Sequence, residues 1–342
     1  MRIRRASVAG TLALTALLVI GGATPAMAAA TPADLGVLPG TGSSHATAIN
    51  DHGVIVGESR NSDYRRAVRW ERDGSMTELA RPEGRKTTQA WAVNSSGVVV
   101  GDAQDPELER PVRWDAQGRV EVLTLPVNEQ GNSSGYAVGV NDDGVVVGQS
   151  SYYTEDKWFE RGLRWSPDGA MSILDPLPGH ERSLVRAVGA DGTAVGSSNL
   201  GNNQVAVRWL PDGTVTPLPA LPGQTSNRAE AVNRHGVIVG LSGSRPVRWN
   251  LDGTVTDLGL VPGGRAGIAN DINDDGLITI ESRFHELGDS RAVLRELDGT
   301  LTVLPVLHDE EAGIAAGVNN SGTVVGLSGD PRTFSRATRW DR

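Results

Sequence analysis

The 342-residue chain contains no cysteine, and aromatic residues make up only 4% of it. Without cysteine there is no disulfide and no lipid attached through a thiol, so the fold must be stable through packing and hydrogen bonds. The six histidines are scattered without the spacing of zinc ligands, and phosphate-binding loops and dinucleotide fingerprints are absent. We therefore expect no cofactor.

Long apolar runs are also missing, except near the start of the chain. Residues 1–28 combine a basic head (Arg2, Arg4, Arg5), an apolar stretch and a small-residue site at Ala26-Met27-Ala28, which is typical of a secretory signal peptide. Removing these residues takes away three arginines and no acid, which shifts the formal net charge from −9 to −12. Such an acidic surface argues against nucleic acid and anionic membranes as partners. We expect residues 29–342 to form one secreted domain, extracellular or associated with the cell wall, that does not insert into a membrane and is a monomer.

A four-strand unit is repeated along this domain, and its clearest copy runs from Arg228 to Pro262. Two short β-branched runs meet at the turn Asn233–Gly236, and a third, ending in Arg-Trp, is joined to a fourth by Asp252-Gly253. Short β-branched runs separated by Asn, Asp and Gly turns are typical of antiparallel hairpins. The unit is therefore predicted to be an antiparallel meander of four strands, a to d.

Seven copies of this unit are present at a spacing of 40 to 48 residues. The glycine of the a–b turn recurs at Gly53, Gly97, Gly144, Gly192, Gly236, Gly276 and Gly322. An Asn stands three residues before it in every copy except the fourth, which has Gly189. Strand c ends in Arg-Trp in all copies except the sixth, which has Leu294-Arg295 and also has Ile280 where strand b elsewhere has Gly. This period and strand number predict an all-β, seven-bladed β-propeller of four-stranded antiparallel blades.

The two ends of the domain predict how the ring closes. The segment that begins at Ala33-Asp34-Leu35-Gly36 is similar to strand d of the fifth copy, Asp257-Leu258-Gly259, whereas the seventh copy ends at Arg342 without a strand d. We expect the N-terminal strand to complete the last blade, because closure removes the exposed edges of an open array.

Inside each blade, the strand-c Trp is expected to fill the wedge between neighbouring blades. The Arg before it, and a second Arg three residues earlier, are expected to act as struts that stack on Trp and pair with acids.

Together these residues resemble the HAF-repeat family of bacterial extracellular proteins. The repeat of that family has a D-L-G strand, an A-x-A-I-N-x-x-G-x-V-V-G hairpin and the sequence H-A-F-x-W. Matching positions here are Asp257-Leu258-Gly259, Ala48-Ile49-Asn50, Val324-Val325-Gly326 and Arg66-Ala67-Val68-Arg69-Trp70. The His-Ala-Phe tripeptide is replaced by Arg-Ala-Val or Arg-Pro-Val. The resemblance implies secretion and a propeller-like repeat, and it implies no particular activity.

Two faces of the ring are expected to differ. The a–b and c–d turns are short and uniform and form what we call the plain face, whereas the b–c and d–a connections vary and form the variable face. Varied loops on a rigid frame are where binding sites usually lie. Aromatic residues gather on the variable face, which indicates a surface for a glycan or a protein; the predicted binding residues among them are Trp91, Tyr136, Tyr152, Tyr153, Trp158 and Phe159.

A second candidate site lies at the central channel. One position of strand a differs in every copy and is expected to point towards the channel; its residues are Thr47, Trp91, Val138, Arg186, Glu230, Asn270 and Ala316. Trp91, Arg186 and Glu230 could hold a small ligand there, although Arg186 and Glu230 could equally neutralise each other.

Metal and catalytic signals are weak. Asp271, Asn273 and Asp275 match the start of a calcium loop, but Ser282 stands where its closing acid belongs, and the same turn forms in other copies without the first Asp. We therefore expect a hairpin turn and no metal site. Acids on the variable face, such as Glu181, could form a glycosidase pair, but a solvated acidic surface explains them as well.

The sequence thus predicts a secreted, non-enzymatic propeller that binds an extracellular glycan or protein. Two alternatives stay open, a polysaccharide hydrolase or lyase and a structural envelope protein without a defined ligand.

Overall fold

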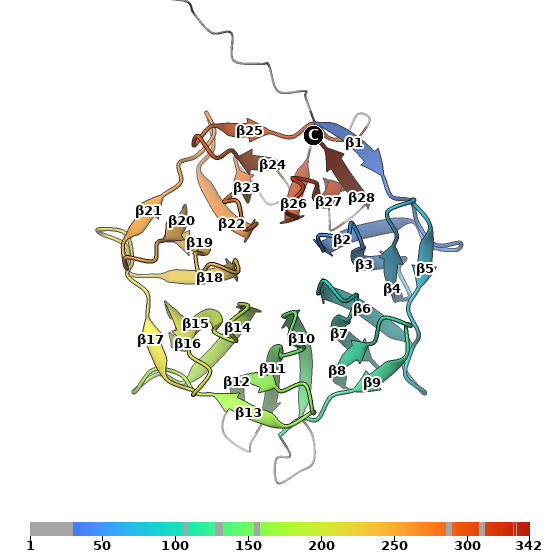
Figure 1. Cartoon of the computed structure of the whole chain (residues 1–342), viewed down its shortest axis with the longest axis horizontal. Helices are drawn as coiled ribbons and strands as arrows, with labels where there is room; N and C mark the ends of the chain where they lie inside the picture. The colour runs from blue at the N-terminus through green and yellow to red at the C-terminus, as the bar shows by residue number, and fades with distance from the viewer. Residues whose placement is uncertain are drawn as a thin grey trace, which may run out of the picture.

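In the computed structural model, the described residues form antiparallel sheets arranged around a central axis (Figure 1). The structure describes residues 30–105, 108–126, 133–153, 158–284, 289–307, 312–330, 332 and 334–342, with the side chains of 152, 153 and 158 left out. The predicted signal peptide lies outside these residues. Within the described ranges, no helix is long and apolar enough to cross a membrane. There are seven sheets of four strands each, so the predicted seven-bladed β-propeller is confirmed.

The blades follow one another in chain order. Blade 1 contains β2 (Ser43–Ile49), β3 (Ile55–Arg60), β4 (Arg65–Trp70) and β5 (Met76–Glu78). Blade 2 contains β6 (Thr87–Val93), β7 (Val99–Gln104), β8 (Glu109–Trp114) and β9 (Val120–Val122). Blade 3 contains β10 (Ser134–Val140), β11 (Val146–Tyr153), β12 (Trp158–Trp165) and β13 (Met171–Leu174). Blade 4 contains β14 (Arg182–Val188), β15 (Ala194–Leu200), β16 (Asn203–Trp209) and β17 (Val215–Pro217).

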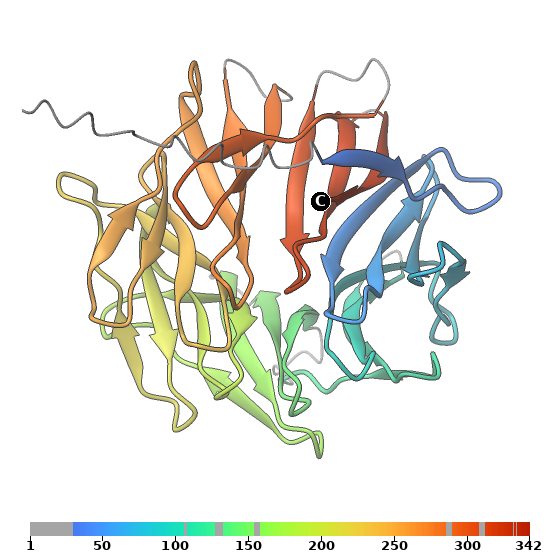
Figure 2. The same ribbon diagram turned by 45° about the horizontal axis from the view of Figure 1, so that its top comes forward.

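The remaining blades complete the circle. Blade 5 contains β18 (Asn227–Val232), β19 (Ile238–Ser242), β20 (Arg245–Trp249) and β21 (Val255–Asp257). Blade 6 contains β22 (Ala266–Ile272), β23 (Ile278–Arg283), β24 (Ser290–Arg295) and β25 (Leu301–Val303). Blade 7 contains β26 (Gly313–Val318), β27 (Val324–Asp330) and β28 (Phe334–Asp341), with β1 (Thr31–Asp34) as its fourth strand. The first strand of each blade lies nearest the axis, and Figure 2 shows the connections gathered at the two faces.

Closure of the ring occurs as predicted, with a shift in the bounds of the closing strand. β1 pairs antiparallel with β28, with Ala33 opposite Arg339. The strand ends at Asp34, whereas the sequence comparison placed the strand from Ala33 onward. The reason is local, because Asp34 accepts a hydrogen bond from the amide of Gly36 (2.8 Å) and Gly36 has φ of 82°. The Asp-Leu-Gly sequence is therefore the turn that leaves the sheet.

Each of the six strand-c tryptophans joins its blade to the one before it, and blade 6 has no such Trp. They are at most 2% exposed. Each indole Nε1–H donates to a backbone carbonyl that follows the outer strand of the preceding blade, at 2.5–2.8 Å; the acceptors, for Trp70 to Trp340 in order, are Leu35, Ala80, Thr124, Asp175, Pro219 and Pro305. The predicted wedge role is confirmed, and a buried polar atom is satisfied at each seam.

The strand arginines are struts, but they do not stack on Trp as predicted. In the described part of the chain, Arg66, Arg161 and Arg291 lie over Tyr64, Phe159 and Phe284, at 4.0–5.6 Å from the ring centroids. The tryptophan faces are unavailable because they are buried between blades. Other arginines pair with acids as predicted, for example Arg336 with Asp34 at 2.8 Å.

Blade 6 departs from the others by a coupled exchange of side chains. In blade 3, a Cβ on Gly148 would lie 2.9 Å from Cζ3 of Trp165, so the indole covers the strand-b glycine. Blade 6 has Arg295 at the Trp position, since both residues stand opposite the first residue of strand b. Ile280, which replaces the glycine, is 2% exposed and packs in the apolar cluster between blades 5 and 6. Ile280 therefore occupies volume that Trp fills elsewhere.

Candidate functional site

Seven inward-facing side chains, one from each blade, line one cavity of about 510 Å³. They are the residues of the variable strand-a position, Thr47, Trp91, Val138, Arg186, Glu230, Asn270 and Ala316. In every copy this position is the extra residue of a β-bulge between strands a and b, as Thr47 is between Ala46 and Ala48, and a bulge redirects the side chain of its extra residue. The position lies in the second half of strand a, towards the plain-face turn, whereas the lining residues His45 and Gln89 stand nearer the variable face. The predicted orientation of this position is confirmed.

The cavity unites four of the predicted binding residues. Trp91, Tyr136, Arg186 and Glu230 all line it, and Trp91 is 37% exposed. Tyr136 donates its hydroxyl to Gln149 Oε1 (2.7 Å). Thus four blades each place an aromatic or charged side chain on one concave surface.

Arg186 and Glu230 form an ion pair, as expected from the interpretation that they neutralise each other. Nε of Arg186 lies 3.7 Å from Oε2 of Glu230, and Oε1 of Glu230 accepts a hydrogen bond from Arg228 Nε. The Nε of Arg186 is buried and has no hydrogen-bond partner among the described residues. The ion pair therefore includes no hydrogen bond from Arg186 Nε, and this N–H donor of a cavity-lining residue stays unused.

The other four predicted aromatics belong to a different place. Tyr152 and Tyr153 in β11 pair with Phe159 and Trp158 in β12, so this hairpin prolongs blade 3. Phe159 lies under Arg161 and is not among the residues that line the central cavity. The side chains of Tyr152, Tyr153 and Trp158 fall outside the described part of the chain.

Blade 2 adds an acid pair that the sequence reasoning missed. Asp102 in β7 is 2% exposed, and Glu109 in β8 lines the cavity. Their carboxyl groups are hydrogen-bonded to each other, and Trp91 Nε1 donates to Asp102 Oδ1 at 2.7 Å. Burial raises the pKa of Asp102. Burial and then the charge of Asp102 raise the pKa of Glu109 to about 7, against the opposing charge of Arg65. Burial and mutual repulsion therefore favour a protonated form of the pair up to about neutral pH.

Beside this pair, blade 1 buries a second polar group. Glu58 in β3 is 2% exposed and lies 3.3 Å from His45 Nδ1, 3.7 Å from Arg60 Nε and 3.9 Å from Arg65 Nε. Burial, followed by the charge of Arg60, lowers the pKa of His45 to about 4. His45 is thus neutral at pH 7, and Glu58 is balanced by the two arginines.

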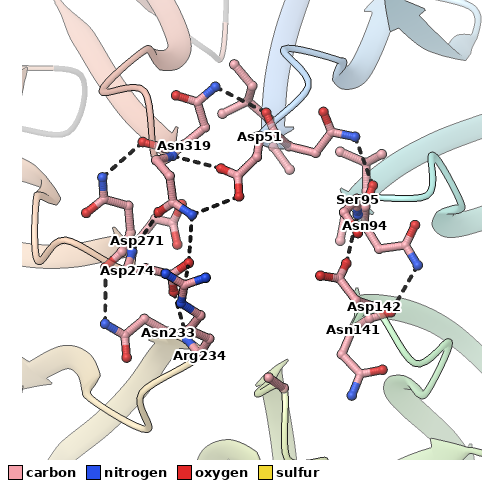
Figure 3. Close-up of a pocket in the computed structure, with 18 of the residues that line it drawn as sticks. Asp51, Asn94, Ser95, Asn141, Asp142, Asn233, Arg234, Asp271, Asp274 and Asn319 are labelled. Carbon is pink, nitrogen blue, oxygen red and sulfur yellow. Dashed lines mark hydrogen bonds and ion pairs between the residues drawn. The ribbon is translucent and has the colours of Figure 1, made fainter.

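At the plain face, asparagine side chains form a nearly complete circle around the axis (Figure 3). The Asn of each a–b turn donates Nδ2–H to the backbone carbonyl of the matching residue in the next blade, at 2.9–3.1 Å; the donors are Asn50, Asn94, Asn141, Asn233, Asn273 and Asn319. The circle is interrupted at Gly189, which has no side chain. Asn319 donates to Asn50, so the circle continues across the closure. These side-chain amides therefore have a structural role, because they link neighbouring blades.

The predicted calcium-loop residues lie in this same region and are engaged with the backbone. Asp271 accepts hydrogen bonds from the amides of Ile272 and Val318, and Asn273 accepts from that of Leu277. Asp275 is exposed. Among the residues whose placement is described, no group of three His, Asp or Glu side chains is arranged to hold a metal ion. The geometry is that of a hairpin turn.

One signal in the sequence could have pointed to the missed acids. The residue after the strand-b glycine is apolar at Leu241 and Leu327 but acidic at Glu58 and Asp102. An acid on the innermost hairpin of a propeller cannot reach bulk solvent at the rim. Its presence there indicates either a buried ion pair or a polar cavity.

Comparisons with known proteins identify the fold. No protein-family model matches the chain, and no curated protein sequence matches it. A streptogramin B lyase structure is similar, with 14% identity and a TM-score of 0.62 over 91% of this chain and 97% of that chain. The virginiamycin B lyase from Staphylococcus aureus is similar with 14% identity and a TM-score of 0.59 over 92% and 99%. The acylaminoacyl peptidase of Pyrococcus horikoshii matches with 14% identity and a TM-score of 0.56 over 87% of this chain and 51% of that chain. At this identity the likeness concerns the fold alone.

Proposed function

We propose that this protein is a secreted, non-enzymatic binding propeller that holds a short segment or terminus of an extracellular glycan in its central cavity. The observation that carries the proposal is the convergence of Trp91, Tyr136, Arg186 and Glu230 from blades 2 to 5 on one cavity. Its volume of about 510 Å³ is within the roughly 300–1,000 Å³ of small-ligand sites.

The chemistry of the wall favours a sugar over a flat protein surface. An exposed indole offers an apolar face for a pyranose ring, while Gln89, Asn270 and Glu230 offer hydrogen-bonding groups around it. A protein partner would need a broad interface of about 800 Å² per side. A concave opening enclosed by seven strands suits a narrow ligand better.

The test is binding of an oligosaccharide panel to residues 30–342, followed by isothermal titration of the sugars that bind. Trp91→Ala is expected to weaken binding at least tenfold, about 1.4 kcal/mol. Phe334→Ala is the matched control, because Phe334 is 48% exposed and does not line the cavity. Absence of saturable binding to any sugar, or equal losses in the two variants, would contradict the proposal.

A second candidate is a polysaccharide hydrolase or lyase. The observation that favours it is the Asp102–Glu109 pair, because a carboxyl group protonated near pH 7 can act as a general acid towards a leaving group. Two structures of similar fold are named as lyases. Turnover of a bound polysaccharide that is abolished by Glu109→Gln would establish this function in place of the first.

A further inference from the structure

The acids at the cavity differ in how their charge is balanced. Glu230 is hydrogen-bonded to Arg228, and Glu281 lies 2.7 Å from Arg283 Nε. Glu58 has Arg60 and Arg65 within 4 Å. Within the described ranges, Asp102 and Glu109 have no basic side chain within ion-pairing distance, and burial and mutual repulsion favour a protonated form of the pair instead. Among the described acids that line the cavity, Glu109 therefore has the least compensated charge, because Arg65 acts on it only from beyond ion-pairing distance.

An aromatic face adjoins the pair. Trp91 is fixed by its hydrogen bond to Asp102, and it presents an exposed indole to the cavity beside Glu109. Tyr136 stands on the next blade and lines the same wall. A cation placed over an indole and next to a carboxylate gains from the ring quadrupole and from a charge-assisted hydrogen bond. A neutral sugar hydroxyl gains much less from either group.

We infer that the ligand carries a protonated amine, as an amino sugar does, and that its ammonium group binds over the exposed face of the Trp91 indole, at the carboxyl group of Glu109. The inference rests on the proposed function and specifies the class of glycan. N-acetylation removes the positive charge, so a deacetylated amino sugar is preferred to its N-acetylated form.

Proton exchange gives the inference a distinct pH signature. The charged and titratable groups that face Glu109 are Asp102 on β7, Arg65 on β4 and Tyr136 on β10, beyond which lie Glu160 and Arg186. Below the pKa of Glu109, about 7, binding of an ammonium group releases the proton of the pair. By linkage, affinity then rises by up to about tenfold per pH unit until that proton is lost. An uncharged ligand shows no such rise.

The experiment is titration calorimetry of residues 30–342 with a β-1,4-linked glucosamine trisaccharide and with its N-acetylated counterpart. Measurements at pH 5.5, 6.5 and 7.5, in two buffers of different ionisation enthalpy, count the protons released by the unmodified protein. We expect the amine form to bind at least tenfold more tightly at pH 6.5, where its amino groups still carry protons, and the protein to release most of one proton there. Glu109→Gln is expected to abolish both effects, whereas Glu121→Gln, at a blade 2 acid that is paired with Arg113 and does not line the cavity, retains them.

The outcomes separate this inference from the proposed function. Equal affinity for both trisaccharides, or amine binding without proton release, overturns the inference and leaves glycan binding standing. Failure of every sugar to bind contradicts both. Because proton release is measured on the unmodified protein, the result does not depend on whether Glu109→Gln folds.

Discussion

Removal of the closing strand tests the ring most directly. Deleting residues 30–38 takes away β1 and the segment that follows it. The deletion breaks the ladder with β28 and the hydrogen bond from Leu35 N to Ala337 O (2.9 Å). It also removes the acceptor of Trp70 Nε1, which is Leu35 O at 2.8 Å, and the acceptor of Ser44 Oγ, which is Gly36 O at 2.7 Å. Both donors would remain buried without a partner.

The size of the effect follows from these contacts. Each lost hydrogen bond costs about 1 kcal/mol, and a buried donor left unsatisfied costs about 1–3 kcal/mol. Leu35 and Leu38 are partly buried against the apolar cluster that contains Trp70, and half of a leucine's transfer free energy adds about 1 kcal/mol each. The total of roughly 5–8 kcal/mol is comparable to the whole stability of an ordinary domain, about 5–15 kcal/mol. We expect the shortened chain to be largely unfolded or aggregated at 25 °C.

Urea unfolding followed by tryptophan fluorescence measures this, since the six strand-c indoles are buried. The proteins compared are residues 30–342 and 39–342, and the synthetic peptide 30–38 is added back to the second. We expect the peptide to restore the cooperative transition at high concentration and a Leu35→Asp peptide to fail. An unchanged unfolding midpoint for residues 39–342 would show that closure contributes nothing to stability.

Three further perturbations test separate parts of the frame. Asn319→Ala removes the donor to Asn50 O and is expected to lower the free energy of unfolding by about 1–3 kcal/mol in urea titrations; no loss would show that the circle of amides is not stabilising. Ile280→Gly and Arg295→Trp should each lower the free energy of unfolding. The double variant should be about 1–3 kcal/mol more stable than the sum of the two single losses predicts. Strictly additive losses would refute the exchange of volume between the two positions. Burial raises the pKa of Asp271 to about 6, so the folded state retains a proton that the unfolded state loses between about pH 4 and 6, and stability falls as pH rises through that range. Between pH 4 and pH 7, the free energy of unfolding of Asp271→Asn should therefore rise by about 1–3 kcal/mol relative to that of the unmodified chain, a range reduced because Asp271 is partly exposed. Parallel pH profiles of stability for the two proteins would contradict the raised pKa of Asp271.

Much of the fold could be predicted because the frame uses the same residues in every copy. The a–b turn needs Gly at positive φ, as at Gly53 with φ of 81°, and an Asn whose side chain reaches the next blade. Both requirements are met once per blade and therefore appear as a period. The bounds of β1 were harder to predict, since Asp-Leu-Gly is apolar enough to continue a strand. Only the hydrogen bond from Gly36 N to Asp34 shows that it turns.

The acid pair could not be predicted in the same way. Asp102 and Glu109 lie on neighbouring strands, and only the register of β7 and β8, with Asp102 opposite Pro111, puts them on one face. Because this pair of acids occurs in only one blade, a single sequence does not reveal the strand register that brings the two residues together. The place of Phe159, which does not line the cavity, likewise depends on how far the hairpin of β11 and β12 extends, and the repeat does not specify this length.

Structural residues and candidate binding residues differ in whether their polar atoms are already hydrogen-bonded within the fold. The residues that recur have their polar atoms engaged at seams, as the indole of Trp114 is with Ala80 O, and a ligand could reach them only by opening the ring. The positions that differ between copies face the cavity, where no neighbouring blade requires a particular side chain. Blade 2 is distinctive because three such departures coincide there, an indole, a buried Asp and a half-buried Glu. A frame needs none of the three, and together they form a surface for a cation. That coincidence is why we place the recognition of the ligand on blade 2 and not on the better balanced Arg186–Glu230 side.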